Sequence, residues 1–587
     1  MEVFEAYGYR HVWCIDFEFV ALRGHKPLVV CMVAKCLITG KALHLWGDEL
    51  VHCPFKCGDD EIFVAYYASA ETSCFDALGW PPPRRVLDLF ADFRRITNGR
   101  IPLHGNGLIG ALLYFGLPSI GGEDKEAMRT LIMSGGPWSD TEREAILSYC
   151  ESDVDALVRL LPRLLPLFGQ GEVQLGQAFL RGRYMAALGV VENNGVPIDV
   201  ALLDRLIANW DAIKARLIAA VDVDYGVYDG TRFVERRFES YLAKHSIAWP
   251  RAQTGKLLLD EDTFRDQAKA HPELRALHEL RTTLGQLRLN KLSVGPDGRC
   301  RTLLSAFSAK TSRNQPSTTE FIFGPSRWIR HLIKPEAGRA LAYVDWSSQE
   351  LAIAGAMSGD VRLWQAYEGG DPYIGFAIQA GIAPQGATKA SHPTERDQCK
   401  SIVLGVNYGM SAAGIAAKSG IHVDRARELL RLHRATYHVF WAWAEANVTH
   451  CLLGYPLETV FGWRIHFPPN SGVEINTRSI LNWPMQAHGA EMMRLAVSMA
   501  IEAGLMICAP VHDALLLEGP ADEIEAQAQR LAQIMGDASE IVLGKGKRCR
   551  SDIKIVRSPD RYVDDKDDGK FFAKVMALLS AAEAAAP

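Results

Sequence analysis

The sequence predicts an α/β multidomain protein, because strand-like and helical runs alternate in one part of a long chain that is rich in apolar residues. The chain has 587 residues, 48% hydrophobic and 23% charged, so it can bury several cores. Within residues 1–165, strand-like runs at 12–20 and 28–36 alternate with helical stretches. From Arg181 onward helical patterns dominate. Three strand-like runs interrupt them: 340–344, 505–511 and 514–518.

Net charge and cysteine content indicate how the protein could bind nucleic acid and in which compartment it works. The formal net charge of −5 gives no overall attraction to phosphate, so nucleic-acid binding would have to use local basic faces. Twelve cysteines without a repeated spacing, and no charged-then-apolar leader, predict reduced thiols and a cytoplasmic protein. No apolar run reaches bilayer-spanning length, which predicts no membrane association. His52, Cys53 and Cys57 could bind zinc, but no second Cys/His pair lies at ligand spacing nearby.

Two acids lie on the first expected strand, in the segment Trp13-Cys14-Ile15-Asp16-Phe17-Glu18-Phe19. Because they are two residues apart on a strand, Asp16 and Glu18 project from the same face. Paired negative charge among apolar neighbours is costly, and a divalent cation such as Mg²⁺, which prefers carboxylate oxygens, would relieve it. The alternative interpretation is an exposed strand face without a ligand.

A second acidic segment lies on an expected helix at residues 149–157, where Tyr149 and Asp153 share a face at i, i+4. Such a helix could place a third carboxylate near the strand pair, with the phenol orienting a water. Between the two segments lies Tyr66-Tyr67-Ala68-Ser69-Ala70-Glu71.

Together these segments resemble the three motifs of the DEDDy 3′→5′ exonucleases. The resemblance implies an RNase H-like domain at residues 1–170, with Tyr149 positioning the attacking water for hydrolysis of the terminal phosphodiester. It also implies four ligands for two metal ions: Asp16, Glu18, Glu71 and Asp153. The middle motif departs from the family. Tyr66 and Tyr67 stand in place of His-Asn and Glu71 in place of Asp, so Asp88 is the alternative fourth ligand, and a degenerate domain that no longer cuts is the alternative function.

A further pair of carboxylates is separated widely in the sequence. Asp345 stands at the end of the apolar run 340–344, just before an expected helix. Asp513 stands in the two-residue His512-Asp513 turn of the hairpin. If the strand and the hairpin pair in one sheet, the two aspartates meet, which is the arrangement that phosphoryl transfer with two Mg²⁺ ions needs. A structural His-Asp turn is the alternative.

A stripe of side chains lies on a third expected helix, where Arg396, Lys400, Leu404 and Tyr408 are spaced by four. Each step of four turns about 40° around the helix axis, so these side chains form one slowly rotating stripe. Its two cations suit a triphosphate, and a tyrosine beside a glycine suits a base or template contact. A solvated basic helix face is the alternative.

The order of these segments resembles the family A (DNA polymerase I-like) DNA polymerases over about residues 180–560. Asp345 to Glu350 looks like motif A, Arg396 to Gly409 like motif B and His512-Asp513 like motif C. Two other segments, 311–316 and 478–486, look like the family's Thr-Gly-Arg segment and its minor-groove-reading helix; 454–464 fits the segment between. The resemblance implies a right-hand polymerase domain with these parts: thumb 180–300, palm 301–362 and 451–587, fingers 363–450.

The resemblance also implies a role for each matching residue. Asp345 and Asp513 would hold two Mg²⁺ ions, with Mn²⁺ as a substitute. Arg396 and Lys400 would grip the incoming dNTP, and Lys400 would protonate the leaving pyrophosphate. The remaining nucleotide contacts are Glu350, which would exclude a 2′-hydroxyl, Tyr408 near the templating pair, Leu404 and His512. Four residues would contact primer-template DNA: Arg313, Arg478, Asn482 and Gln486.

Two residues of the expected polymerase site differ from those of the family, which implies altered tuning of the site and not its loss. Leu404 stands where the family has Phe or Tyr, and Ala514 follows Asp513 where the family has Glu. In the expected thumb, a basic run would lie along duplex phosphates: Arg281, Arg288 and Lys291. We expect a monomer with possible replisome partners, of the phage or plasmid replicase type, because no chain is left for a 5′ nuclease domain.

Three rival functions remain open at this stage. A single-subunit RNA polymerase shares the palm aspartates, although Glu350 and the nuclease motifs argue against it. A non-catalytic nucleic-acid-binding scaffold would bind DNA without incorporating dNTPs. In the third alternative only the nuclease acts.

Overall fold

The computed structural model describes residues 2–100, 102–119, 122–168, 171–286, 289–324, 326–467 and 476–584. The chain divides into two compact units. The first comprises Met1–Asn194, Leu304–Gln315 and Leu341–Ile555. The second comprises Gly195–Leu303, Pro316–Ala340 and Val556–Pro587. The second palm range expected at 451–587 therefore spans both units, and the expected domain ranges themselves stay predictions.

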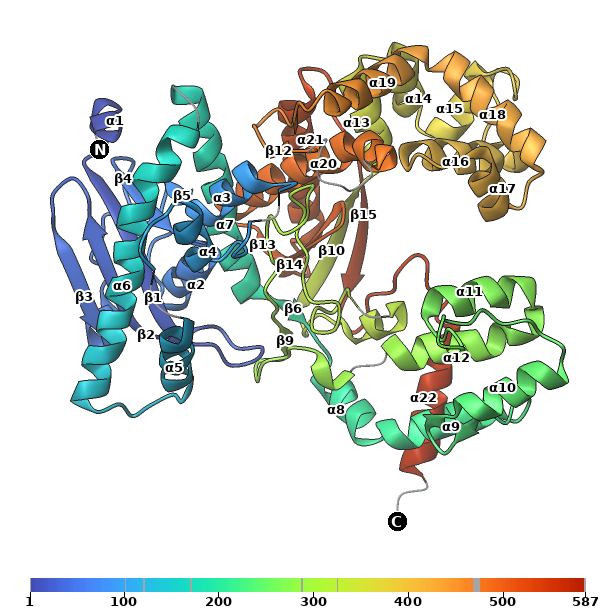
Figure 1. Cartoon of the computed structure of the whole chain (residues 1–587), viewed down its shortest axis with the longest axis horizontal. Helices are drawn as coiled ribbons and strands as arrows, with labels where there is room; N and C mark the ends of the chain where they lie inside the picture. The colour runs from blue at the N-terminus through green and yellow to red at the C-terminus, as the bar shows by residue number, and fades with distance from the viewer. Residues whose placement is uncertain are drawn as a thin grey trace. The chain divides into compact units, whose positions relative to one another are not determined.

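The N-terminal part of the first unit contains a five-stranded mixed sheet (Figure 1). Its strands are β1 His11–Val20, β2 Leu28–Cys36, β3 Ala42–Trp46, β4 Glu61–Ala65 and β5 Val86–Asp88, in the order β3-β2-β1-β4-β5. β1 runs antiparallel to β2 and parallel to β4. The strands expected at 12–20 and 28–36 are confirmed. They pair so that Asp16 lies opposite Val33 and Glu18 opposite Cys31.

Helices surround this sheet: α1 Glu2–Ala6, α2 Ser69–Ala77, α3 Leu89–Thr97, α4 Leu108–Tyr114, α5 Gly122–Met133, α6 Asp140–Leu164 and α7 Glu172–Asn194, with the 3₁₀ turns η1 Gly47–Val51 and η2 Leu165–Leu167. α6 contains the helix expected at 149–157 and packs on β1 and β2 (Figure 1). It begins at a capping box, because Ser139 Oγ accepts from the Glu142 backbone and Glu142 Oε2 accepts from Ser139 N–H at 2.7 Å. Val154 and Leu157 of α6 are buried in the same core as Val12 and Cys14 of β1.

A second sheet in the first unit has the order β13-β14-β10-β15. Its strands are β10 Arg339–Trp346, β13 Met506–Val511, β14 Ala514–Pro520 and β15 Ser551–Arg557. The single strand and the hairpin expected from the sequence are thus confirmed, and they belong to one sheet. Three helices accompany this sheet: α13 Gln349–Ser358, α20 Thr477–Glu502 and α21 Ile524–Leu543. α20 packs on α7, α13, α21 and β13.

The remaining helices of this unit follow one another in the chain, and α15, α17 and α18 pack on α16 (Figure 1). They are α14 Val361–Glu368, α15 Pro372–Gln379, α16 Pro393–Asn407, α17 Ala412–Ser419, α18 Val423–Thr436 and α19 His438–Leu452, followed by the small ladder β11 Leu457–Glu458 and β12 Arg464–Ile465. α16 carries Arg396, Lys400 and Leu404 as expected, but it ends at Asn407, so Tyr408 is its C-terminal cap.

The second unit is mainly helical. Its elements are β6 Val196–Pro197, α8 Val200–Ala208, α9 Trp210–Asp222, β7 Tyr228–Asp229, β8 Arg232–Phe233, α10 Glu235–Lys244, α11 Glu261–Ala270, η3 Pro272–Leu274, α12 Arg275–Gln286, η4 Leu289–Lys291, β9 Arg299–Cys300, η5 Arg327–Leu332 and α22 Lys570–Glu583. None of the helices in the described part of the chain combines the length and apolar character that crossing a bilayer requires.

One expectation for the thumb has to be corrected. The Arg281 guanidinium lies 4.2 Å from the ring centroid of Phe233 and 4.3 Å from that of Phe264, and it donates to the Leu259 carbonyl. Arg281 therefore serves the packing of this unit instead of facing phosphates. Lys291 is exposed, and Arg288 lies outside the described residues.

Candidate active sites

Asp345 lies near the end of β10, and Asp513 lies in the turn between β13 and β14. The Trp346 N–H donates to the Asp513 carbonyl at 3.1 Å, which joins the end of β10 to the turn between β13 and β14. That turn is tight because Val511 pairs with Ala514 and His512 takes a left-handed φ of 56°. Asp345 and Asp513 are both half-buried. Sheet pairing thus brings together two backbone segments that are 168 positions apart, each with an aspartate, and carboxylate oxygens are the ligands that Mg²⁺ prefers.

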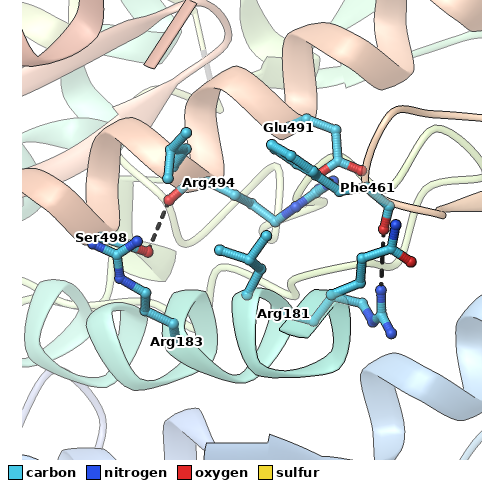
Figure 2. A pocket seen from close by; sticks show the side chains of 9 residues that line it. Arg181, Arg183, Phe461, Glu491, Arg494 and Ser498 are labelled. Atoms are coloured by element: carbon cyan, nitrogen blue, oxygen red, sulfur yellow. Dashed lines mark hydrogen bonds and ion pairs between the residues drawn. The ribbon is translucent and has the colours of Figure 1, made fainter. Parts of the chain in front are cut away.

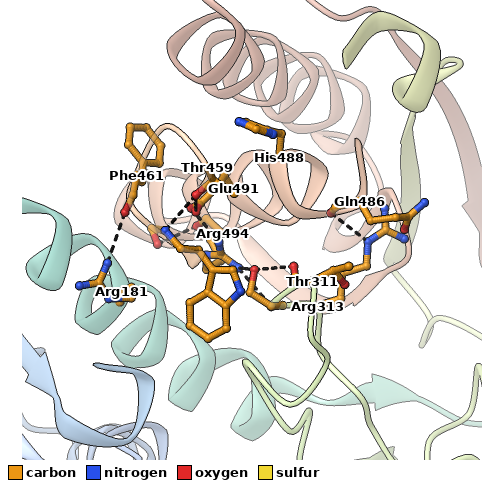
Figure 3. Close-up of polar contacts among 12 residues, drawn as sticks. Arg181, Thr311, Arg313, Thr459, Phe461, Gln486, His488, Glu491 and Arg494 are labelled. Carbon is orange, nitrogen blue, oxygen red and sulfur yellow. Dashed lines mark hydrogen bonds and ion pairs between the residues drawn. The ribbon is translucent and has the colours of Figure 1, made fainter. Parts of the chain in front are cut away.

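Glu350, at the start of α13, is held by two hydrogen bonds to the same oxygen. Tyr408 O–H donates to Glu350 Oε1 at 3.2 Å, and Gln486 Nε2 donates to that atom as well. Arg313 adjoins this group, since its Nε donates to the Gln486 carbonyl at 3.4 Å (Figure 3). Burial lowers the pKa of the Arg313 guanidinium, while the charges of Glu350 and Asp513 act in the opposite direction. Residues from four sequence segments therefore converge beside Asp513.

The stripe on α16 faces α15. Arg396 Nε donates to Asp371, the N-terminal cap of α15, and its guanidinium lies 5.2 Å from the ring centroid of Tyr373. Lys400 Nζ lies 5.9 Å from the same ring, and this lysine is exposed. Sequence reasoning missed Asp371 and Tyr373. Their only local signal is the Asp-Pro start of a helix.

The end of α16 meets the start of α20. Asn482 Nδ2 donates to the Asn407 carbonyl at 3.0 Å. Gly409 has a φ of 61°, and a Cβ there would lie 2.9 Å from Arg478 Cγ, so glycine permits this close approach. Leu404 is half-buried, and His512 is exposed at its turn. The predicted nucleotide and DNA contacts thus group around α16, α20 and the hairpin.

A buried polar network holds Ser312, the residue that precedes Arg313 (Figure 3). Arg494 pairs with Glu491 at 2.7 Å and donates to the carbonyl and hydroxyl oxygens of Ser312 at 3.1 and 2.9 Å. Thr459 Oγ1 donates to Glu491 Oε1 at 2.7 Å. The sequence analysis missed Glu491 and Arg494, although charges at i, i+3 inside an apolar helical run are a usable signal.

A small cavity lies between α7 and α20 (Figure 2). It has a volume of about 10 Å³, which is no more than one water needs. Arg181 beside it donates to Asp92 at 2.5 Å and to the Phe461 carbonyl at 3.3 Å. Both members of this ion pair are buried, so the cavity is part of the packing between α7, α20 and the segment around Phe461, not a ligand site.

The N-terminal acids form a second cluster. Ligand atoms of Asp16, Glu18 and Cys150 lie within 4.8 Å of one another. Burial raises the pKa of Asp16 to about 8, with the charge of Asp153 adding to the effect, and raises that of Glu18 to about 10, with Asp16 adding. Glu71 Oε2 is buried and has no hydrogen-bond partner among the described residues. This donor set fits a hard divalent cation. Burial also raises the pKa of the Cys150 thiol.

Asp153 and Tyr149 come to this cluster from α6. Burial, followed by the charge of Asp153, raises the pKa of Tyr149, so its phenol stays protonated and can donate. Both oxygens of Asp153 accept from Lys125, a residue of α5 that the sequence analysis did not single out.

Asp88 has a different role. Its Oδ1 accepts from Ala91 N–H at 2.7 Å as the N-terminal cap of α3, and its Oδ2 accepts from Ala68 N–H at 2.6 Å. With both oxygens engaged by backbone donors, Asp88 is a weaker ligand candidate than Glu71. Similarly, Cys53 and Cys57 donate to the carbonyls of Phe55 and Pro81, and His52 joins no three-donor group among the described residues. None of the twelve cysteines, all of which are described, forms a disulfide.

Comparison with known families identifies the class. Residues 256–551 match the sequence model described as DNA polymerase family A. Since this match covers about half of the chain, the chain belongs to DNA polymerase family A.

Individual relatives agree with that assignment. The chain is 27% identical over 427 residues to the thermostable DNA polymerase I of Thermus aquaticus, covering 68% of this chain and 50% of the relative. It is 23% identical over 425 residues to the DNA polymerase of Mycobacterium phage D29, covering 69% and 67%. The chain thus spans about half the length of the Thermus relatives it matches.

A solved structure shares the fold. The POL domain of Pol1 from M. smegmatis, in complex with DNA primer-template and dNTP, matches with a TM-score of 0.68 at 20% identity, covering 92% of this chain and 95% of that one. The predicted α/β multidomain fold is therefore confirmed as one that resembles a family A polymerase domain.

Proposed function

We propose that this protein is a template-directed DNA polymerase that adds dNTPs to a primer 3′ end by two-metal phosphoryl transfer. The observation that carries the proposal is the hydrogen bond from Trp346 N–H to the Asp513 carbonyl, which joins the end of β10, where Asp345 lies, to the turn that carries Asp513. Mg²⁺ ions held there, two per site with Mn²⁺ as a substitute, would activate the 3′-hydroxyl and stabilise charge on the pyrophosphate.

The other residues of this chain act on the nucleotide and the duplex. Lys400, exposed beside the Tyr373 ring, binds the triphosphate together with Arg396 and delivers a proton to the leaving pyrophosphate. Glu350, fixed by Tyr408 and Gln486, closes the space beside the sugar 2′ position. Leu404 and His512 complete the nucleotide pocket. Four side chains contact primer-template DNA: Arg313, Arg478, Asn482 and Gln486.

We further propose that the N-terminal domain is an RNase H-like 3′→5′ proofreading exonuclease. Asp16, Glu18, Glu71 and Asp153 would hold its metal ions, and the protonated Tyr149 phenol would orient the water. The D29 relative is a phage DNA polymerase, which supports a replicase of the phage or plasmid type. We propose that the protein acts as a monomer in the cytoplasm, with possible replisome partners.

The decisive test compares primer extension and 3′ trimming in matched variants. Asp345→Asn and Asp513→Asn should each lower extension by more than about 10²-fold and leave trimming intact, because each removes charge from the palm site alone. Asp16→Asn combined with Glu18→Gln should do the reverse. Asp522→Asn, at an exposed position after β14, is the control and should change neither activity. Loss of both activities together in a folded single-site variant would refute the two-site assignment.

A further inference from the structure

Lys125 lies against the proposed nuclease site. Its Nζ is 2.8 and 2.9 Å from the two carboxylate oxygens of Asp153, and 5.6 Å from the ring centroid of Tyr149. The pair is largely buried, with the side chains 23% and 13% exposed. A bidentate contact of this kind uses both oxygens through which Asp153 could hold a cation.

The Lys125 ammonium offsets part of the negative charge of the cluster. The cluster contains four acids: Asp16, Glu18, Glu71 and Asp153. Among the described residues, the ion pair that involves one of them is that of Lys125 with Asp153. Lys35 of β2 pairs instead with two other acids of α6, at 2.8 Å with Glu151 and 2.6 Å with Asp155. One positive charge therefore offsets part of a buried cluster of four carboxyl groups.

The Lys125 ammonium and a divalent metal ion would compete for the same carboxylate oxygens of Asp153. Both need the same lone pairs, and two cations held side by side in a partly buried site repel each other. The lysine ammonium is carried on a flexible four-carbon chain, so it can move away from Asp153, whereas a backbone N–H donor could not.

We propose that Lys125 is an internal counter-ion that competes with divalent metal for Asp153, so that metal enters the nuclease site only when Lys125 leaves it. This rests on the proposed nuclease function. Lys125 is thereby a positioning residue that sets the metal concentration at which trimming begins, separately from the palm site.

The test measures Mn²⁺ binding by electron paramagnetic resonance in the full-length protein, with Asp345→Asn and Asp513→Asn present to weaken the palm site. Lys125→Gln should tighten Mn²⁺ binding by on the order of tenfold, the scale of one partly buried ion pair. Lys125→Arg keeps the charge and should stay near the parent affinity. Lys41→Gln, at an exposed position next to β3, is the control and should match the parent.

The outcomes separate the two claims. Unchanged or weaker Mn²⁺ binding in Lys125→Gln, with binding still abolished by Asp16→Asn, would overturn the competition and leave the nuclease site standing. Mn²⁺ binding that is insensitive to Asp16→Asn in every background would overturn both the nuclease site and the competition. Thermal unfolding in chelator shows whether Lys125→Gln remains folded, and Lys125→Met serves as a second neutral variant if it does not.

Discussion

At the scale of single residues, the proposed polymerase site depends on side chains held by one another. Glu350 Oε1 accepts from both Tyr408 and Gln486, and Gln486 in turn accepts from Arg313 through its carbonyl. A carboxylate fixed by two donors is a rigid wall, because turning away would leave both donors without their acceptor. Discrimination against ribonucleotides should therefore depend on Glu350 directly.

Replacing Glu350 by Ala should lower the preference for dNTPs over rNTPs by about 10²-fold, since the wall beside the sugar disappears. Single-nucleotide incorporation with each substrate measures the preference. Glu368→Ala, exposed at the end of α14, is the control. Unchanged discrimination would contradict the role given to Glu350, and efficient rNTP use by the parent would favour the RNA polymerase alternative.

At the scale of elements, the helices around α16 enclose a histidine that stays neutral. His433 of α18 is buried, and Trp441 Nε1–H of α19 donates to its Nδ1 at 3.2 Å. Burial lowers the pKa of His433 to about 3. An acceptor nitrogen facing an N–H donor has no place for a second proton, so the packing of α18 on α19 depends on the neutral ring.

The sign of the pH effect follows from that lowered pKa. In the unfolded chain His433 is protonated as the pH falls below about 6.5, whereas in the folded protein it stays neutral down to about pH 3. Protonation therefore favours the unfolded chain, and the stability present above pH 6.5 is lost as the pH falls. The loss should reach about 2 kcal/mol by pH 5. Denaturant unfolding at pH 7 and pH 5 measures it. His433→Gln should remove this part of the pH dependence, whereas His104→Gln, at an exposed position, should keep it. Equal pH dependence in both variants would contradict the assignment.

At the scale of the whole molecule, a buried ion pair and several hydrogen bonds connect residues 1–194 to the later segments of the first unit. Arg181 of α7 pairs with Asp92 of α3 and also donates to the carbonyl of Phe461. The Asn98 amide of the N-terminal domain donates to the carbonyls of Lys310 and Arg464. These contacts join residues 1–194 in one compact unit with the segments that carry Asp345 and Asp513.

Arg181→Met should lower the free energy of unfolding of this unit by about 3 kcal/mol, because Asp92 would be left buried without this partner. Arg183→Met on the same helix is the matched control. Its pair with Glu502 is exposed, so we expect a loss of less than about 1 kcal/mol. Denaturant titration followed by fluorescence compares the two. A similar small loss in both variants would show that the Arg181 pair does not hold the unit together.

The local pattern of the sequence sufficed for the strands that carry the acids. β1, β2 and β10 follow from apolar runs and strand alternation, and the β13–β14 hairpin follows from two such runs around His512-Asp513. The stripe on α16 follows from helical spacing, apart from Tyr408, which lies just past the helix end. These features are set within about ten neighbouring residues, where periodicity is informative.

Tertiary structure alone decided which distant groups meet. The contact of Lys125 with Asp153, the support of Ser312 by Arg494 and the capping role of Asp88 join residues whose spacing carries no period. Arg281 shows the same limit, since a basic residue expected to face phosphates packs between two aromatic rings. By itself the sequence determined the elements and the acids they carry. Only folding decided the partners, because burial and pairing depend on chain segments that local periodicity cannot relate.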